Sequence, residues 1–154
     1  MENLNLPEHP LKTRPTENGK VEVFDEFRKK YVALSPEEWV RQQFLWYLVD
    51  VKQFPASLIA VEKGLILNGL KKRFDAVVFS NKGVPLMLLE FKSTEIQLQQ
   101  KVFEQIASYN LQMKVKYLVV SNGLQHFCCV VDYNKQQFEF LKKIPGFSEL
   151  IQPQ

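Results

Sequence analysis

Two acidic residues and a lysine, carried on two apolar segments, are the residues of this chain best suited to chemistry. Asp75 follows a basic run, and Glu90 and Lys92 close an apolar segment as Glu-Phe-Lys. Two carboxylates and a backbone carbonyl are the hard oxygen ligands that Mg²⁺ accepts, and the metal stabilises charge on a phosphate and lowers the pKa of a bound water. A neighbouring lysine could orient or deprotonate that water, or hold a phosphate oxygen. These residue types therefore predict phosphodiester hydrolysis at Mg²⁺ or Mn²⁺.

A β-hairpin is expected to bring these residues together. Segments 71–79 and 84–92 are rich in strand-forming apolar residues, and the stretch between them is typical of a turn. Side chains alternate across a strand, so Glu90 and Lys92 share one face. Symmetric pairing places Asp75 opposite Glu90 or two residues away, on that same face. The alternative is that the two acids are solvent-facing strand residues, with Lys92 as an ion-pair partner.

A helix over about residues 95–112 is expected to follow. Thr94 and Gln97 have capping-box spacing, and apolar residues then recur at three- and four-residue steps. Gln105 falls on this apolar stripe with Tyr109 one turn away, so we expect both to face the sheet. A buried amide without partners costs about 1–3 kcal/mol, which favours a role for Gln105 in the site and for Tyr109 at the site or the DNA strand. The alternative is a glutamine satisfied by backbone, with an ordinary core tyrosine.

These residues resemble the PD-(D/E)xK nuclease superfamily. The resemblance lies in an acid on one strand, Glu-x-Lys on the next and Gln-x-x-x-Tyr on the following helix, in the order Asp75, Glu90, Lys92, Gln105 and Tyr109. More closely, the stretch from about Ser35 to Asp132 is similar to the N-terminal nuclease domain of type I restriction enzyme R subunits. Its Pro-Glu-Glu-Trp-Val-Arg-Gln segment and the later Ser-Asn-Gly belong to that similarity.

The resemblance implies a fold and a set of roles. The fold is an α/β restriction-endonuclease-like core, with a central mixed β-sheet flanked by helices. The activity is Mg²⁺-dependent DNA cleavage, with Asp75 and Glu90 as metal ligands and Lys92 as a catalytic residue. Phe74 stands where the motif's name has proline.

One part of the type I R subunit is not expected in this chain. Those subunits carry an ATP-driven motor after the nuclease domain, and 154 residues leave no room for one. The nearest approach to a Walker A motif, residues 64–71, has leucine at the lysine position. We therefore expect no ATP site, and nuclease activity that is motor-free or depends on a partner, either other restriction-modification subunits or a second copy in a homodimer.

Glu38, in the expected first helix, is interpreted equally well as a metal ligand or as a helix-capping residue. Ser35 and Pro36 are expected to begin this helix as N-cap and first residue, with Glu38 at capping-box distance. Related nucleases often have a first-helix glutamate near the metal, which makes Glu38 a third candidate metal ligand. A capping role explains the same residue without any metal.

The rest of the chain is expected to form one domain. Residues 1–20 are interpreted as an extended arm, 21–144 as a single nuclease-like domain and 145–154 as a tail. A β-α-β unit with parallel strands within a mixed sheet is expected around the second helix. Further strands are expected at about 21–24, 30–34, 58–66, 116–121, 125–132 and 137–141, with hairpin turns at Asn68-Gly69 and Asn122-Gly123.

Charge and cysteine usage limit the possible partners. The net charge of +3 and a pI near 8.8 mildly favour a polyanion, and the run Lys71-Lys72-Arg73 is the best candidate for DNA contact. Cys128 and Cys129 are adjacent in an apolar segment and are expected to stay reduced on opposite faces of a strand. No zinc-ligand spacing, signal peptide or membrane-length apolar run occurs, so a cytoplasmic protein without membrane contact is expected.

Two functions from different classes follow from the sequence. The first is a metal-dependent DNA endonuclease domain of the type I R-subunit kind, without the motor. The second is a nucleic-acid-binding or regulatory module that keeps the nuclease fold with weak or absent activity. A domain whose acidic pair is accidental is a third, simpler possibility.

Overall fold

A computed structural model describes residues 1–67 and 69–152, without the side chains of Tyr109 and Asn110. The chain forms two β-sheets, one of three strands and one of six. In chain order the elements are β1 (Thr13–Pro15), β2 (Val21–Asp25), β3 (Lys30–Ala33), α1 (Pro36–Asp50), the short 3₁₀ helix η1 (Ala56–Leu58), β4 (Ile59–Leu67), β5 (Leu70–Phe79), β6 (Pro85–Phe91), α2 (Gln100–Leu111), β7 (Tyr117–Ser121), β8 (His126–Asp132), β9 (Gln137–Leu141) and α3 (Phe147–Leu150).

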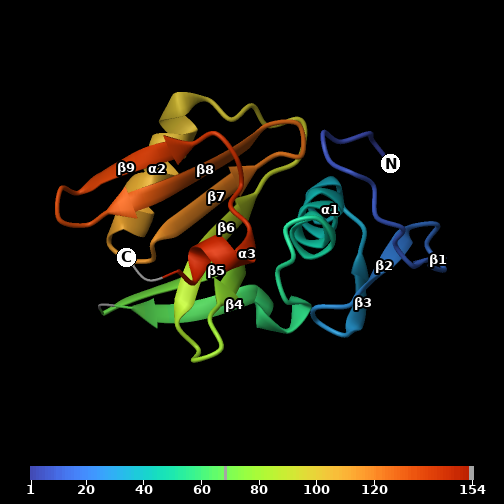
Figure 1. Cartoon of the computed structure of the whole chain (residues 1–154). Coiled ribbons are helices and arrows are strands. Elements are labelled where there is room, and N and C mark those ends of the chain that lie inside the picture. The colour runs from blue at the N-terminus through green and yellow to red at the C-terminus, as the bar shows by residue number, and fades with distance from the viewer. Residues whose placement is uncertain (68, 153–154) are drawn as a thin grey trace.

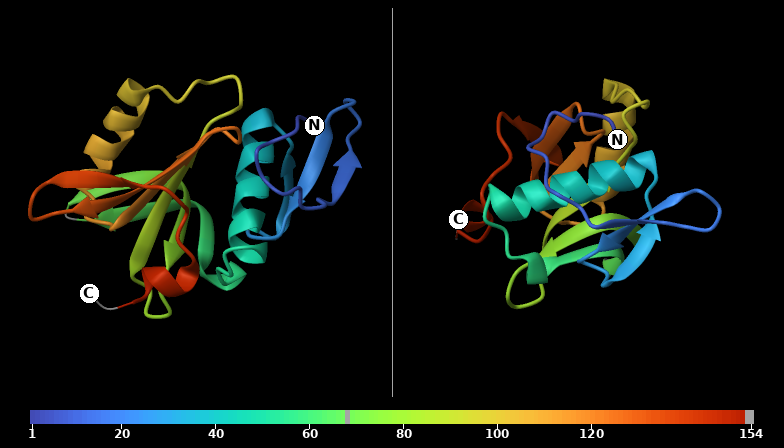
Figure 2. Two further views of the ribbon diagram at one scale, coloured as in Figure 1. Left: turned by 45° about the horizontal axis from the view of Figure 1, so that its top comes forward. Right: turned by 90° about the vertical axis from the view of Figure 1, so that its right-hand side faces the viewer.

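The six-stranded sheet is mixed, as expected for the nuclease-like core. Its strand order is β4-β5-β6-β7-β8-β9, and only β6 and β7 pair in parallel (Figure 1). A parallel pair needs a crossover, which α2 provides. The three-stranded sheet lies on the far side of α1, so that this helix is held between the two sheets (Figure 2).

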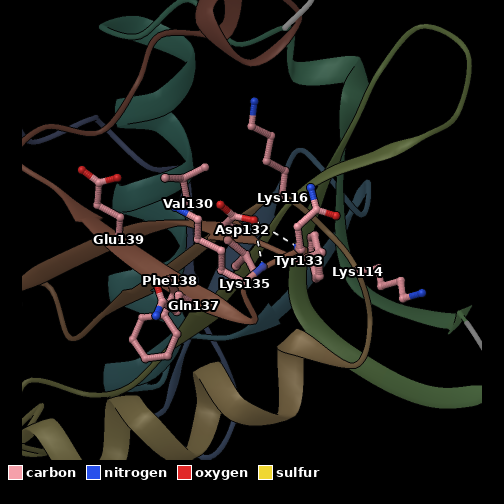
Figure 3. A pocket seen from close by; sticks show the side chains of 11 residues that line it. Lys114, Lys116, Val130, Asp132, Tyr133, Lys135, Gln137, Phe138 and Glu139 are labelled. Carbon is pink, nitrogen blue, oxygen red and sulfur yellow. Dashed lines mark hydrogen bonds between the residues drawn. The ribbon is translucent and has the colours of Figure 1, made fainter.

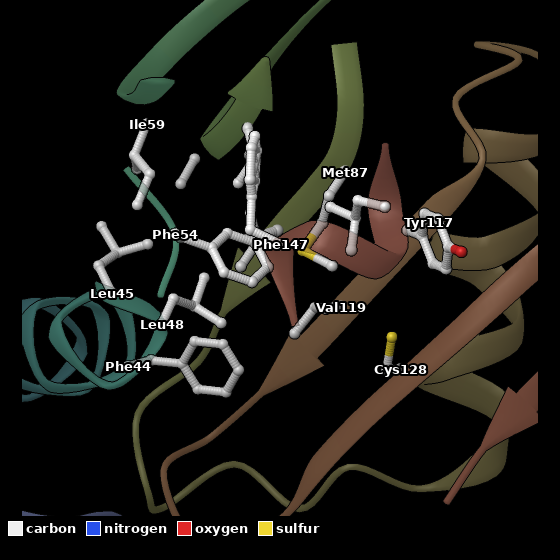
Figure 4. Packing of buried hydrophobic residues seen from close by; sticks show 14 of the residues in the cluster. Phe44, Leu45, Leu48, Phe54, Ile59, Met87, Tyr117, Val119, Cys128 and Phe147 are labelled. Carbon is white, nitrogen blue, oxygen red and sulfur yellow. The ribbon is translucent and has the colours of Figure 1, made fainter. Parts of the chain in front are cut away.

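Both faces of the six-stranded sheet are covered, and alternate side chains serve each face. Met87 and Leu89 of β6 pack in one buried cluster with Phe44 and Leu48 of α1 (Figure 4). Leu88, between them in the chain, belongs to a second buried cluster that includes Phe103 and Ala107 of α2. A strand buried on both faces is a continuous apolar run, and residues 86–89 are Leu-Met-Leu-Leu.

The first helix begins as expected. The Ser35 Oγ accepts a hydrogen bond from the backbone N–H of Glu38 at 3.0 Å, and Pro36 occupies the first turn. This hydroxyl satisfies one of the backbone donors that a helix start leaves open. The helix is in contact with β6, where its Phe44 ring packs against Phe91.

The second helix starts five residues later than expected. Residues 94–96 form a turn instead, in which Ile96 N–H donates to the Ser93 carbonyl at 3.1 Å. Tertiary bonds hold this segment, since the Asn122 amide donates to the Ile96 carbonyl at 2.8 Å and Lys92 N–H donates to the Ser121 carbonyl at 2.9 Å. The predicted capping box was wrong because these long-range bonds outweigh a local helix start.

Most of the expected strands are confirmed within one or two residues. The Asn122-Gly123 turn joins β7 to β8, with Asn122 Oδ1 accepting the N–H of Leu124 and Gln125 at 3.0 and 2.8 Å. Gly69, with φ +77°, stands at the β4–β5 turn, and its neighbour Asn68 lies outside the described residues.

Segments at both ends of the chain also contact the folded core. Glu2 O accepts a hydrogen bond from the Trp39 indole at 2.9 Å, so the start of the chain lies along α1. At the other end, Phe147 and Leu150 of α3 are buried in the α1-side cluster. Across the part of the chain that the structure describes, no helix has the length and apolar character needed to cross a membrane.

Candidate active site

Asp75 and Glu90 lie side by side on neighbouring strands, as the hairpin prediction required. Ala76 of β5 pairs with Leu89 of β6, which places the two acids next to one another. The Asp75 carboxylate accepts a hydrogen bond from the backbone N–H of Phe91 at 2.7 Å and shares a side-chain hydrogen bond with Glu90. The shared face of the two carboxylates is therefore confirmed.

The proximity of these acids changes the protonation of Glu90. Burial and the negative charge of Asp75 raise the pKa of Glu90 to about 7, against the opposing charge of Lys72. Two carboxylates in one place resist double ionisation, and burial in low dielectric penalises the charge further. Near neutral pH the pair therefore holds a proton for about half of the time.

The ammonium beside Glu90 belongs to Lys72 rather than to Lys92. Lys72 Nζ lies 3.3 Å from Glu90 Oε1, and it also lies 4.8 Å from the centroid of the Phe74 ring. Lys92 sits just past the end of β6 and, among the described residues, takes part in no ion pair within 4 Å. The alternative in which Lys92 only neutralises Glu90 is thus wrong.

A second glutamate of α1 reaches this cluster, and the sequence interpretation missed it. Burial raises the pKa of Glu37, as does the charge of Asp75, while Lys92 and Arg41 oppose the rise. Glu37 is therefore close enough to Asp75 and Lys92 for their charges to act on it. The signal was present in the Pro-Glu-Glu segment, because successive helical residues are about 100° apart and only one of two adjacent glutamates can face the end of β6.

The Glu38 side chain is held by guanidinium groups in this structure, and whether it binds a metal stays a prediction. Its buried carboxylate accepts hydrogen bonds from Arg28, from Arg41 at 2.6 and 2.9 Å and from Gln42 at 3.2 Å. Although burial raises the pKa of Glu38, the bonds and charges of Arg41 and Arg28 hold that pKa below its ordinary value. A carboxylate so fully paired with guanidinium groups serves as a structural ion pair.

The prediction that Gln105 faces the sheet was wrong. Gln105 is exposed, and the buried side of α2 carries Phe103 and Ala107 instead. Because α2 starts later than expected, core packing determines its rotation about its axis. The large Phe103 ring is the side chain that packs against the sheet. The prediction that Tyr109 faces the sheet concerns a side chain outside the described part of the structure.

The basic run before Asp75 is divided between solvent and ion pairs. Lys71 is exposed, Lys72 joins Glu90 as above, and Arg73 lies 2.8 Å from Glu62 with 69% of its side chain exposed. Lys71 and Arg73 thus remain accessible to a polyanion. Lys72, in contrast, already forms an ion pair with Glu90.

Asp75 and Glu90 are half-buried on neighbouring strands. A hollow of about 710 Å³ lies elsewhere, lined by Lys114, Lys116, Tyr133 and Lys135 among others and by none of the predicted catalytic residues (Figure 3). Across residues 1–67 and 69–152, no three His, Cys, Asp or Glu side chains form a ready-made metal cluster. The hollow adjoins the start of β7, whereas Asp75, Glu90 and Lys92 gather near the end of β6.

The chain is similar to one described family and to a solved structure. The model of the family described as type I restriction enzyme R protein N terminus matches residues 36–145. A search of the curated proteins gives no match. Among solved structures, a protein of DUF820 from Anabaena variabilis, described as a candidate nuclease, is similar at 13% identity and a TM-score of 0.48, over 91% of this chain and 89% of that one.

The family match includes every element that builds the site. Residues 36–145 extend from the start of α1, with Glu37, through the strands that carry Asp75 and Glu90 and beyond β9. The mixed six-stranded sheet with its flanking helices is the restriction-endonuclease-like core expected from the sequence. The chain is a nuclease-like domain that belongs to the family of type I restriction enzyme R protein N-termini.

Proposed function

We propose that this domain hydrolyses DNA phosphodiester bonds with Mg²⁺ or Mn²⁺ held by Asp75 and Glu90. The observation that carries the proposal is the convergence of three elements, β5, β6 and the first turn of α1, on one accessible acidic site with Lys92 at its border. The raised pKa of Glu90 supports it, because burial and the charge of Asp75 disfavour the ionised carboxylate even with Lys72 beside it, and a bound divalent cation would favour that ionised form.

The donor set suits a hard divalent ion. Asp75 and Glu90 provide carboxylate oxygens, and the Phe91 carbonyl follows directly in the chain. Mg²⁺ usually keeps several waters and binds through one or two carboxylates plus phosphate oxygens, so a third protein carboxylate is not required. When bound, the ion would stabilise negative charge on the phosphate and lower the pKa of a coordinated water.

The remaining side chains have roles that follow from their places. Lys92 is suited to orient the attacking water or hold a phosphate oxygen, because its ammonium forms no ion pair with the described residues. Glu37 is placed to accept a proton or a water hydrogen at the same border. Lys71 and Arg73 are exposed and suit phosphate contacts on either side of the scissile bond. Assembly with other restriction-modification subunits, or as a homodimer, belongs to this proposal.

A specific observation favours a second candidate, a DNA-binding or regulatory module of low activity. Gln105 points to solvent rather than into the site, so one element of the expected nuclease motif is missing from the acidic cluster. A module of this kind would bind DNA through Lys71 and Arg73 but leave it intact.

The direct test is cleavage of supercoiled plasmid by the purified protein. We expect nicked and linear products with Mg²⁺ or Mn²⁺, none with EDTA, and none from Asp75→Asn or Lys92→Ala. Lys82→Ala is the matched control, since Lys82 is exposed in the β5–β6 turn away from the acids. Cleavage that persists in Asp75→Asn would refute the proposed site.

Calorimetry separates the two candidates. A nuclease should bind Mn²⁺ in a manner that Glu90→Gln abolishes. If the protein retards DNA in a gel at low salt but neither binds Mn²⁺ nor cuts under any metal condition, the binding module is the correct function.

A further inference from the structure

The strand that carries Asp75 changes its facing at that residue. From Ala76 to Val78 the side chains of β5 alternate regularly, with Ala76 and Val78 in the α1-side cluster and Val77 in the α2-side cluster. Regular alternation would put Phe74 with Ala76. Phe74 instead packs in the α2-side cluster, so the strand turns about its axis at Asp75.

The neighbouring strand has an unusual backbone at the same level. Val61 pairs with Ala76 and Lys63 with Phe74, which places Glu62 opposite Asp75. Glu62 has φ +52°, in the left-handed region that a residue with a side chain rarely occupies. Such conformations persist only where the surroundings enforce them. The pair Glu62 and Asp75 is thus the point at which both strands depart from regular geometry.

Three arginines from different elements enforce this backbone. The Glu62 carboxylate lies 2.8 Å from Arg73, 3.3 Å from Arg28 and 3.6 Å from Arg41. Arg73 also donates to the Glu62 carbonyl at 3.2 Å, so both ends of this residue are fixed. The arginines come from β5, from the segment after β2 and from α1.

Two of these arginines are themselves firmly held. Arg28 pairs with Asp25, which is fully buried, and with Glu38. Arg41 pairs with Glu38 through two hydrogen bonds, and 8% of its side chain is exposed. Glu62 is therefore tied through Arg41 to α1 and through Arg28 to the segment that follows β2 of the three-stranded sheet.

We propose that Glu62 is a positioning residue, which through its three arginine partners holds the β4–β5 twist that aims Asp75 at Glu90 and at the Phe91 N–H. Its catalytic consequence rests on the proposed function, whereas its structural consequence does not. Asp75 would otherwise lie on a regular strand, and its carboxylate would no longer be set by the backbone of β6. The clamp also links the position of α1, with Glu37, to that of Asp75.

The test measures Asp75 placement separately from activity. In Glu62→Gln, which keeps shape and removes charge, we expect the Phe91 amide signal to shift and to lose hydrogen-exchange protection, as it should in Asp75→Ala. Mn²⁺ affinity by calorimetry should fall at least tenfold, and plasmid cleavage should recover at high Mn²⁺. Glu139→Gln, on exposed edge strand β9, is the matched control and should leave all three unchanged.

Several outcomes decide the matter. If Glu62→Gln lowers only the melting temperature, with the Phe91 amide and Mn²⁺ affinity as in the unaltered protein, Glu62 is merely structural and the inference is overturned. If the unaltered protein does not bind Mn²⁺, the proposed function fails while the Phe91 amide still tests the positioning. Should Glu62→Gln not fold, Arg73→Gln replaces it, because Arg73 is exposed and contacts Glu62 directly.

Discussion

Two carboxylate clusters lie next to each other in this molecule and have opposite electrostatics. Glu38 and Asp25 are buried against Arg28 and Arg41, and the pKa of Glu38 is lowered. Glu90, beside Asp75, has one lysine neighbour, and its pKa is raised to about 7. The first cluster is neutralised by its own protein, whereas the second has an excess of negative charge. The second cluster, whose carboxylates have fewer close cation partners, is the one that we propose to hold a metal.

The largest expected effect comes from removing a charge from the neutralised cluster of Glu38, Asp25, Arg28 and Arg41. Glu38→Gln should lower the free energy of unfolding by up to about 3–5 kcal/mol, because it removes the buried carboxylate that Arg28 and Arg41 share. Arg28 keeps Asp25 and Glu62, and Arg41 keeps the 3.6 Å contact with Glu62. Urea unfolding at pH 8 measures this. Glu90→Gln should be neutral or stabilising in the same assay, and an equal loss in both variants would contradict the contrast.

The next effect concerns catalysis at the cation-poor cluster. Lys92→Ala should reduce DNA cleavage on the order of 10²- to 10³-fold, with an unchanged melting temperature, since Lys92 stabilises charge in the reaction rather than the fold. Single-turnover cleavage at saturating Mg²⁺ measures the rate. Lys72→Ala should have a smaller effect on the rate and should raise the pKa of Glu90 further, because Lys72 is its ion-pair neighbour.

The pH dependence of stability is a third, intermediate effect. A carboxyl whose pKa is raised in the folded state contributes stability that is fully present below its unfolded pKa of 4.5 and is lost as pH rises through about 7. Glu90 should therefore reduce the free energy of unfolding by up to roughly 3 kcal/mol between pH 4.5 and pH 8. Urea midpoints across this range, compared with those of Glu90→Gln, should converge at low pH, diverge between about pH 4.5 and pH 7, and differ by a constant amount above that.

The smallest effect is the proton released on metal binding. Near pH 7 about half of the Glu90 carboxyls carry a proton that Mn²⁺ must displace, so binding should release roughly half a proton. Calorimetry in two buffers of different ionisation enthalpy measures the number. Release should vanish at pH 9, where Glu90 is already ionised, and a value near zero at pH 7 would place the metal away from Glu90.

Local patterns predicted much of the fold and the centre of the site. The apolar strands, the Ser35 cap and the facing of Asp75 and Glu90 all depend on short-range alternation, turns and capping, which neighbouring residues specify. The same reasoning failed for α2. Its rotation was decided by the burial of Phe103 and by bonds from Asn122, which arise from distant parts of the chain.

The sequence by itself determined the hairpin that carries Asp75 and Glu90, because strand periodicity and turn chemistry are local. Only the tertiary structure decided which glutamate of α1 meets them. Glu37 and Glu38 are adjacent in the chain, and the choice depended on where Arg28 and Arg41 lie in the folded protein. Only the folded structure, likewise, paired Glu90 with Lys72 and set Glu62 in a left-handed backbone opposite Asp75. Charge pairing acts through space, and sequence spacing alone does not specify it.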